Sequence, residues 1–269
     1  MKGCRFRTMK VPIIANGRIK GDYFELVFSA PEIAAAAAAG SFTHIRIDRR
    51  QDRILRRPFS IHDTDPASGT VKVVYKVVGR GTDALSKLAP GSEIDAMGPL
   101  GKTFSPAPAD AIPAAVAGGY GAAALFMLTR HRPGVLLMGA RSSADVILTD
   151  RYREAGFDVR VATNDGSEGT KGLVTELIPP LLAENPGRSF FFYGCGPHPM
   201  LMALARMLRE LKLDGELSVD HVMCCGVGAC FGCVVKVNAP GTPDGWRYAR
   251  SCSEGPVFPL SDVYIEPQR

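Results

Sequence analysis

The sequence lacks a strong excess of charge of either sign. Its 32 Lys and Arg residues against 27 Asp and Glu residues give a formal net charge of only +5 over 269 residues. This mild basic excess fits a soluble enzyme that handles phosphate-bearing ligands, whereas a nucleic-acid-binding protein is usually more basic. The apolar share of 46% excludes a disordered or collagen-like chain. The length suffices for two globular domains, or for one large domain with an appendage.

Long apolar runs that would cross a membrane or direct secretion are also missing. The first fourteen residues carry four basic side chains but no apolar core and no small-residue cleavage site, so we expect a cytoplasmic chain. The longest segment without charge, residues 111–129, reaches the length of a membrane span. Pro113, Gly118, Gly119 and Gly121 interrupt it as they would in a strand, a glycine turn and a buried helix. We therefore expect no membrane span.

The seven cysteines are not spread along the chain as a disulfide scaffold would require. Cys4 and Cys195 stand alone, and the other five lie between positions 224 and 252. Four of the five follow the spacing C-x4-C-x2-C-x18-C, namely Cys225, Cys230, Cys233 and Cys252. This spacing is typical of plant-type ferredoxins, in which four thiolates hold two irons. The small residues between them suit a tight loop whose amide N–H groups point at the sulfurs. The pattern predicts a [2Fe-2S] site.

A zinc site is the alternative for four cysteines. Structural zinc sites favour two ligand pairs with two to four residues inside each pair, unlike the triplet and distant partner found here. Cys224 falls outside the ferredoxin spacing and is expected to be a bystander, because adjacent residues of an extended loop point apart. His221 has no second histidine nearby, which a Rieske-type cluster would need. The spacing favours the iron–sulfur interpretation.

The first hundred residues predict an antiparallel β-barrel or sandwich. Short β-rich runs are separated by turn residues such as Asn16-Gly17 and Pro90-Gly91. One short helix is expected at residues 81–88 with Thr82 as its N-cap. The six alanines at positions 34–39 indicate only a helical turn or a loop. The expected strands are residues 11–19, 23–28, 42–47, 71–78 and 93–97.

The pattern changes after a Gly- and Pro-rich linker at residues 98–113. Apolar strands then alternate with helices, which predicts a parallel sheet with helices on both faces. The expected strands are residues 112–117, 134–139, 158–163 and 189–193, and the expected helices are 122–130, 143–155, 173–183 and 199–211. From Asp214 onward we expect no helix. The predicted domains are a β-barrel (1–104), a nucleotide-binding α/β domain (105–213) and a cysteine-rich module (214–269).

Three glycine-bearing loops follow the expected parallel strands. Gly119, Gly121 and Ala124 match G-x-G-x-x-A between a strand and a helix, where a diphosphate can approach the backbone. The alternative is that these glycines only shape the turn. The loops at 163–167 and 193–197 fall at the carboxyl ends of two more strands, where open α/β sheets bind ligands.

Two side chains at the ends of the expected parallel strands each allow two interpretations. Cys195, between glycines, is placed to touch a nicotinamide, although a lone cysteine is usually an inert buried thiol. Arg141 follows the second strand where an NAD site usually has an acidic ribose ligand, and by its chemistry it favours the 2′-phosphate of NADP.

Taken in order, the motifs resemble ferredoxin reductase-type flavoproteins. In the barrel these are Arg57-Pro58-Phe59-Ser60-Ile61, Tyr75-Lys76-Val77-Val78-Gly79-Arg80-Gly81-Thr82 and Gly98-Pro99-Leu100-Gly101. In the nucleotide domain they are Gly118-Gly119-Tyr120-Gly121, Asp165-Gly166-Ser167 and Cys195-Gly196-Pro197-His198-Pro199-Met200. The cysteine segment from Met223 to Cys233, with Cys252-Ser253-Glu254-Gly255-Pro256-Val257-Phe258, is similar to one branch, the electron transfer subunits of NAD-dependent dihydroorotate dehydrogenase. The resemblance covers nearly the whole chain.

This resemblance implies roles for the matching residues. Arg57 would neutralise the FAD diphosphate, and Pro58, Phe59 and Ser60 would line the isoalloxazine, with Ser60 near its reactive nitrogen. The rest of the FAD would be held by Val74, Tyr75, Lys76, Gly81 and Thr82. Nucleotide contacts would come from Gly118, Gly119, Gly121, Arg141, Asp165, Gly166, Cys195, Gly196 and Pro197. The sequence departs from the family pattern at Phe59, Tyr120 and Asp220.

The resemblance also implies an activity. Electrons would pass from the FMN of a separate catalytic subunit, in a heterotetramer, through [2Fe-2S] and FAD to NAD, in pyrimidine biosynthesis. An iron–sulfur cluster moves single electrons whereas nicotinamide accepts a hydride, so a flavin must connect them. Such a chain needs no general acid or base. One alternative is a self-sufficient NAD(P)H diaphorase associated with a hydrogenase or oxygenase, and another is a non-enzymatic zinc or redox sensor.

Overall fold

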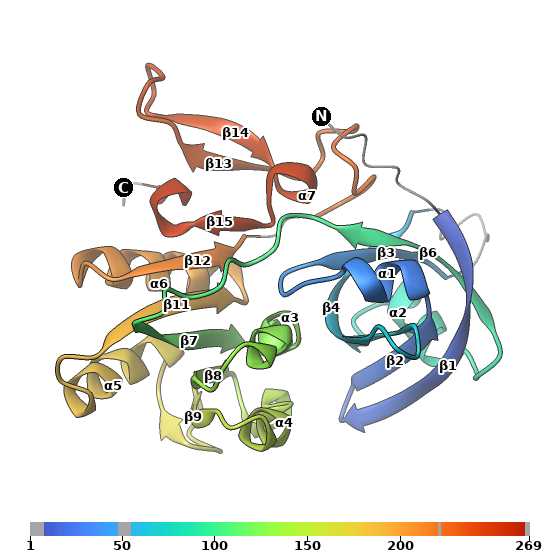
Figure 1. The fold of residues 1–269 in the computed structure, drawn as a ribbon, viewed down its shortest axis with the longest axis horizontal. Helices are drawn as coiled ribbons and strands as arrows, with labels where there is room; N and C mark the ends of the chain where they lie inside the picture. The colour runs from blue at the N-terminus through green and yellow to red at the C-terminus, as the bar shows by residue number, and fades with distance from the viewer. Residues whose placement is uncertain (1–7, 48–54, 220–221, 267–269) are drawn as a thin grey trace.

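The computed structural model describes residues 8–47, 55–219 and 222–266. Six strands close a barrel in the order β1-β2-β5-β4-β3-β6. Their bounds are β1 (Thr8–Lys20), β2 (Tyr23–Ser29), β3 (Phe42–Arg46), β4 (Arg57–Asp65), β5 (Thr70–Lys76) and β6 (Glu93–Leu100). All neighbouring pairs are antiparallel, and the barrel fills the right half of Figure 1. The expected antiparallel barrel is confirmed.

Strand β4 was not among the expected strands, although it carries the Arg57-Pro58-Phe59-Ser60 motif. Its composition is polar and includes a proline, so it does not read as a strand on its own. Pairing with β3 on one side and β5 on the other fixes it as a central barrel strand. Pro58 is exposed, and it lies near the first residue of the strand, where a missing N–H is tolerated.

Two short helices accompany the barrel, α1 (Pro31–Ala36) and α2 (Arg80–Ser86). The alanine run is helical only to Ala36, and Ile33 and Ala34 bury this turn against the barrel core. The expected N-cap at Thr82 is wrong: α2 begins at Arg80, Gly79 is its N-cap and Thr82 is the third helical residue. The Thr82 hydroxyl accepts a hydrogen bond from the Val78 N–H at 2.9 Å and donates to the Gly79 carbonyl at 3.1 Å.

The second half of the chain builds a mainly parallel sheet in the order β10-β9-β8-β7-β11-β12-β15. The strands are β7 (Ala111–Gly118), β8 (Val135–Ala140), β9 (Asp158–Thr163), β10 (Thr170–Lys171), β11 (Ser189–Cys195), β12 (Asp214–Ser218) and the antiparallel β15 (Val257–Pro259). Helices α5 (Ile178–Glu184) and α6 (His198–Glu210) cover one face, and α3 (Gly121–Leu125) and α4 (Thr149–Glu154) lie between the other face and the barrel (Figure 1).

Side chains of neighbouring strand residues divide between two cores. Ala114 and Val116 of β7 pack with α5 and α6, whereas Ala115 and Ala117 belong to the core that continues into the barrel. This alternation is the period of two that a strand imposes. The apolar sequence of β7 reflects burial on both faces, and the barrel replaces solvent on one of them.

The expected helix 199–211 is confirmed as α6, whereas the other three expected helices are each divided between an α-helix and a 3-10 turn. The segment 143–155 is split into a 3-10 turn at Ser143–Asp145 and α4, with Leu148 in the left-handed region at φ 63°. The segment 122–130 is α3 followed by a 3-10 turn. The expectation of no helix beyond Asp214 is wrong at α7 (Ser251–Glu254), a single turn that contains Cys252. A hairpin of β13 (Val234–Asn238) and β14 (Trp246–Arg250) precedes this turn.

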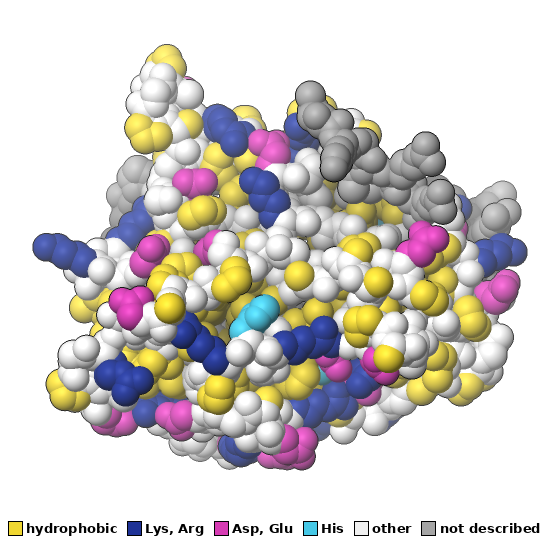
Figure 2. Space-filling model, viewed as in Figure 1, with side chains coloured by type: hydrophobic (Ala, Val, Ile, Leu, Met, Phe, Trp, Pro, Cys, Tyr) yellow, Lys and Arg dark blue, Asp and Glu magenta, His cyan; other side chains and the backbone are white. Residues whose placement is uncertain are grey.

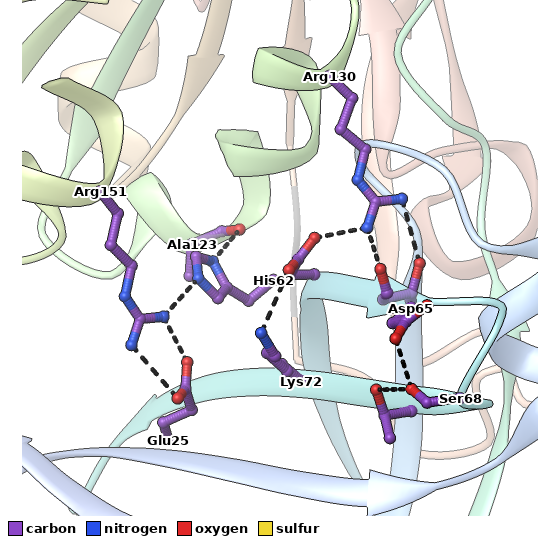
Figure 3. Close-up of polar contacts among 11 residues, drawn as sticks. Glu25, His62, Asp65, Ser68, Lys72, Ala123, Arg130 and Arg151 are labelled. Atoms are coloured by element: carbon purple, nitrogen blue, oxygen red, sulfur yellow. Dashed lines mark hydrogen bonds and ion pairs between the residues drawn. The ribbon is translucent and has the colours of Figure 1, made fainter. Parts of the chain in front are cut away.

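Polar contacts fasten the barrel to the α/β domain, as Figure 3 shows. Arg151 of α4 donates to the Glu25 carboxylate, and its Nη1 lies 3.0 Å from Nε2 of His62. Nδ1 of His62 lies 3.4 Å from the Ala123 carbonyl oxygen. Burial, followed by the Arg151 charge, lowers the pKa of His62 to about 4. Burial alone would raise the Glu25 pKa, but Arg151 holds it below its ordinary value.

No helix within the described residues is long and apolar enough to cross a membrane.

Candidate cofactor sites

The loop that carries Cys225, Cys230 and Cys233, called the cysteine loop below, lies beside Cys252 of α7. Each of these four predicted ligand sulfurs accepts a hydrogen bond from a backbone N–H. Val227 donates to Cys225 at 3.5 Å, Gly228 to Cys252 at 3.2 Å, Gly232 to Cys230 at 3.5 Å, and Cys252 to Cys233 at 3.5 Å. Gly226 and Gly228 adopt φ of +73° and +80°, which side chains rarely allow. Such donors stabilise negative charge on thiolates, as an iron–sulfur site requires.

The four thiols form two pairs. Cys225 contacts Cys230, and Cys252 contacts Cys233. Burial would raise the Cys225 pKa, but the N–H groups of the loop outweigh it and lower that pKa to about 6. Burial and the Cys233 thiol raise the pKa of Cys252 to about 12. Within residues 8–47, 55–219 and 222–266, no three Cys, His, Asp or Glu side chains gather as ligands of one metal ion.

An apolar core joins the cysteine loop to the barrel. It contains Phe42 of β3, Met97 and Leu100 of β6, and the two buried cysteines Cys233 and Cys252. The exposed fractions of these two cysteines are 1% and 2%, whereas Cys230 is exposed. The pair Cys233 and Cys252 therefore faces the protein interior, whereas Cys225 is partly exposed and Cys230 is exposed at the surface.

The α2 end of the barrel holds Arg57. A Cβ added at Gly81 would lie 2.2 Å from Nε of Arg57, so only glycine leaves room for this guanidinium. Arg57 also donates to the Leu55 carbonyl at 2.6 Å. Arg57, expected at the FAD diphosphate, thus lies beside Gly81, which with Thr82 was expected to hold another part of the FAD, at the first turn of α2. A cation beside backbone N–H groups suits a phosphate group.

The other predicted flavin residues divide between two faces. Pro58 and Ser60 lie opposite His44 and Phe42 in the β3–β4 register, so these four side chains share the outer face of the barrel. Phe59 instead points to the core, with its ring edge-on to that of Tyr75 at 5.8 Å between centroids.

Tyr75 and Val74 are buried in β5. The Tyr75 hydroxyl donates to Oδ1 of Asn16 at 2.9 Å, and burial raises its pKa to about 12. Lys76 contacts Asp145 of the α/β domain at 2.6 Å, and its ammonium lies 5.0 Å from the ring centre of Tyr23. The Tyr23 hydroxyl donates to the same Asp145 carboxylate at 2.7 Å. Sequence reasoning missed Tyr23 and Asp145, since nothing local marks a pair 122 residues apart.

The carboxyl ends of β7 and β11 meet at the predicted nucleotide edge. A Cβ at Gly118 would lie 2.6 Å from Cδ of Pro197, and one at Gly121 would lie 2.1 Å from the Cys195 carbonyl oxygen. A Cβ added at Gly196 would also come into close contact with the Gly118 backbone. Gly119 has φ +55°, and its added Cβ would lie 3.8 Å from the Tyr23 hydroxyl. The glycine motif therefore serves close packing of two strand ends at the domain boundary.

The remaining nucleotide residues line the ends of β8 and β9. The Asp165 N–H donates to the Arg141 carbonyl at 3.3 Å, and both residues are exposed. Gly166 adopts φ +77°. The Asp165 carboxylate accepts from the Ser167 N–H and hydroxyl, which hold its pKa below the ordinary value. The parallel strands bring the three predicted glycine-bearing loops and Arg141 to one edge of the sheet, as expected.

Several sequence expectations fall outside the described residues. These are Cys4, Asp220 and His221. On the face shown in Figure 2, Lys and Arg side chains are interspersed with Asp and Glu, and no continuous basic stripe appears.

Comparisons with known proteins bear on each of these sites. Residues 220–264 match the family model "Iron-sulfur cluster binding domain of dihydroorotate dehydrogenase B". The chain is 36% identical over 266 residues to the "Dihydroorotate dehydrogenase B (NAD(+)), electron transfer subunit" of Desulforamulus reducens, covering 97% of this chain and 99% of the relative. It is also 36% identical to the subunit of the same name from Fusobacterium nucleatum, covering 93% and 96%.

A solved structure supports the same fold. It is described as an "NADH-dependent reduced ferredoxin-NADP oxidoreductase" in work on flavin-based electron bifurcation. The TM-score is 0.80 at 26% identity, with 98% of this chain and 92% of that chain covered. A ferredoxin reductase from carbazole 1,9a-dioxygenase matches with a TM-score of 0.63 at 20% identity, covering 77% and 67%.

Proposed function

This chain belongs to the electron transfer subunits of NAD-dependent dihydroorotate dehydrogenase B, and from that premise we propose that it passes electrons between an FMN-containing catalytic subunit and NAD through a [2Fe-2S] cluster and FAD. The observation that carries the proposal is the apolar core that packs Cys233 and Cys252 against barrel strands β3 and β6. It joins the cysteine loop to the barrel that carries the flavin motifs.

The two cysteine pairs support a two-iron cluster over a zinc ion. In a [2Fe-2S] cluster each iron takes two protein thiolates, whereas structural zinc takes all its ligands around one centre. Cys225 with Cys230, and Cys233 with Cys252, match the first arrangement. The N–H donor on every sulfur would stabilise the charge of the bound cluster.

The residues around α2 fit FAD. Arg57 would bind the diphosphate together with the N–H groups of Gly81 and Thr82, and the bare Cα of Gly81 keeps the guanidinium in place. Ser60 and Pro58 would lie along the isoalloxazine from the outer face of β4. Lys76 would act through its ion pair with Asp145, which fixes the nucleotide domain to the barrel. Bound FAD supplies the exchange between hydride and single-electron transfer.

The glycine edge fits a pyridine nucleotide. Gly118 and Gly121 let the loop after β11 pack closely on the end of β7, and the open space beside Gly119 would let a dinucleotide approach the backbone. Cys195, half-buried at the end of β11, would lie near the nicotinamide. We propose NAD as the nucleotide, in line with the names of the relatives, and Arg141 as a ligand of one of its phosphates.

The partner would bind at the cysteine loop. Cys230 is exposed there, and the neighbouring Phe231 is 62% exposed at φ 58°, a strained conformation for a phenylalanine. An exposed aromatic beside the predicted cluster suits a subunit interface. The proposed assembly is a heterotetramer with an FMN-containing catalytic subunit.

The test is the visible spectrum of anaerobically purified protein before and after NADH, with iron and acid-labile sulfide assayed in the same sample. Flavin bands with a broad iron–sulfur shoulder, both bleached by NADH, would support the relay. A colourless, zinc-containing protein that resists reconstitution with FAD and iron would overturn it. Co-purification with a dihydroorotate-oxidising subunit distinguishes this function from that of a free-standing diaphorase.

A further inference from the structure

His44 lies on the outer face of β3, between β4, the strand with the predicted flavin motif, and the cysteine loop. Its register partner on β4 is Pro58, and its partner on β6 is Met97. The side chain is fully buried, with 0% exposed. Phe42, the next outward residue of the same strand, belongs to the core that contains Cys233 and Cys252.

Neither ring nitrogen of His44 has a hydrogen-bond partner among the described residues. Leaving a buried polar group unsatisfied is costly, so such an atom usually marks a missing partner. His62 is equally buried, yet both of its nitrogens have partners, in Ala123 and Arg151. Three other buried polar atoms among the described residues lack a hydrogen-bond partner, Nε of Arg46, Oδ1 of Asp95 and Oγ of Ser251, and Ser251 directly precedes Cys252.

The ring of His44 faces the cysteine loop. A Cβ added at Gly226 would lie 2.9 Å from both Nδ1 and Cε1 of His44, so the imidazole edge rests on the residue that follows Cys225. Burial, and secondarily the charge of Arg56, lower the pKa of His44 to about 4. The ring is therefore neutral at physiological pH and carries one N–H donor.

We propose that His44 donates its ring N–H to a sulfur of the iron–sulfur cluster, and so raises the reduction potential of that cluster; this inference rests on the proposed function. An N–H donor stabilises the more negative, reduced state, because charge on the sulfurs grows on reduction. His44 would thereby connect β3, which pairs with the flavin-motif strand β4, to the cluster by a hydrogen bond.

The experiment is pulsed EPR of the reduced cluster in protein grown with 15N-labelled histidine, together with a redox titration. The chain has only five histidines, which makes the assignment tractable. His44→Leu removes the donor and His44→Gln retains an N–H. His62→Leu is the control for loss of a buried imidazole, and His221→Gln is the control for the histidine nearest the cysteines in sequence. Iron and sulfide are assayed in every sample.

We expect a 15N coupling in the wild-type, His62→Leu and His221→Gln proteins and its loss in both His44 variants. The cluster potential should fall in His44→Leu and return toward the wild-type value in His44→Gln. Absence of the coupling in wild type, its loss in His221→Gln, or an unchanged potential in His44→Leu would overturn the proposal. The wild-type and His221→Gln samples decide the matter even if a His44 variant loses iron. A wild-type protein without iron after reconstitution would instead refute the proposed function.

Discussion

Gly81 offers a direct test of the proposed FAD site. A single carbon added at this position should displace the guanidinium of Arg57, the residue proposed to bind the FAD diphosphate. In Gly81→Ala the new Cβ would lie 2.2 Å from Nε and 2.7 Å from Cζ of Arg57, so the guanidinium must move. The obstructing atoms belong to the far end of a flexible side chain, and alanine favours a helix by about 1 kcal/mol over glycine. The fold should therefore survive while Arg57 leaves its place.

The expected loss follows from the hydrogen bonds that Arg57 would give the diphosphate. Hydrogen bonds to charged groups contribute about 1.5–3 kcal/mol, and each 1.4 kcal/mol is a factor of ten in affinity. Gly81→Ala should thus weaken FAD binding about 10- to 150-fold, measured by flavin fluorescence on titration of the deflavinated protein. Gly79→Ala is the matched control, since nothing lies within 4 Å of its added Cβ. Unchanged affinity in Gly81→Ala, or an equal loss in Gly79→Ala, would refute this role for Arg57.

Three further predictions concern the other surfaces of the molecule. Phe231→Ala should weaken binding of the catalytic subunit by about 2 kcal/mol, or roughly 30-fold in Kd, and leave NADH–dye activity intact. Ile14→Ala, which removes another exposed apolar side chain, is the control. Loss of the dye activity in Phe231→Ala would contradict the assignment of Phe231 to the subunit interface. Gly121→Ala should lower kcat/KM for NADH about 100-fold, because its Cβ would lie 2.1 Å from the Cys195 carbonyl oxygen and displace the strand ends that form the proposed NAD site. Gly17→Ala is the control, since nothing lies within 4 Å of its added Cβ. A normal kcat/KM in Gly121→Ala would count against this edge of the sheet as the NAD site. The third concerns His62, whose folded pKa of about 4 lies below its unfolded value of about 6.5, so the unfolded chain binds the proton first as pH falls. From pH 7.5 to 4.5 this should remove about 2.5 kcal/mol of the unfolding free energy, and urea unfolding of His62→Leu should show a correspondingly flatter pH dependence.

The sequence carries the cofactor motifs more clearly than the elements that hold them. The cysteine spacing is local and chemically specific, and the glycine motif lies between a real strand and a real helix. The strand with Arg57 and Ser60 was missed, because its only apolar alternation, Phe59 and Ile61, is short and lies between a proline and a polar segment. Its place depends on pairing with β3 and β5, which only the closed barrel supplies.

Contacts between domains were equally hidden. Lys76 was expected to bind FAD, and no feature of the sequence pairs it with Asp145, 69 residues away. The contact arises because the 3-10 turn at Ser143–Asp145, which follows β8, meets the barrel where Tyr23 of β2 and Lys76 of β5 are register partners. The same tertiary origin explains β12 and β15: both come from the expected cysteine module, yet they extend the nucleotide-domain sheet.

The position of β15 bears on how the cysteine module is held. β15 follows Cys252 by a few residues and pairs with β12, and β12 in turn pairs with β11, the strand that ends at Cys195. On its other side the module packs through Cys233 and Cys252 against β3 and β6. β3 is hydrogen-bonded to β4, so the cysteine module packs on the strand next to the one that carries the flavin motif. Sheet pairing on one side and core packing on the other thus fix the separation of the two predicted redox centres, which a flexible tether would leave variable.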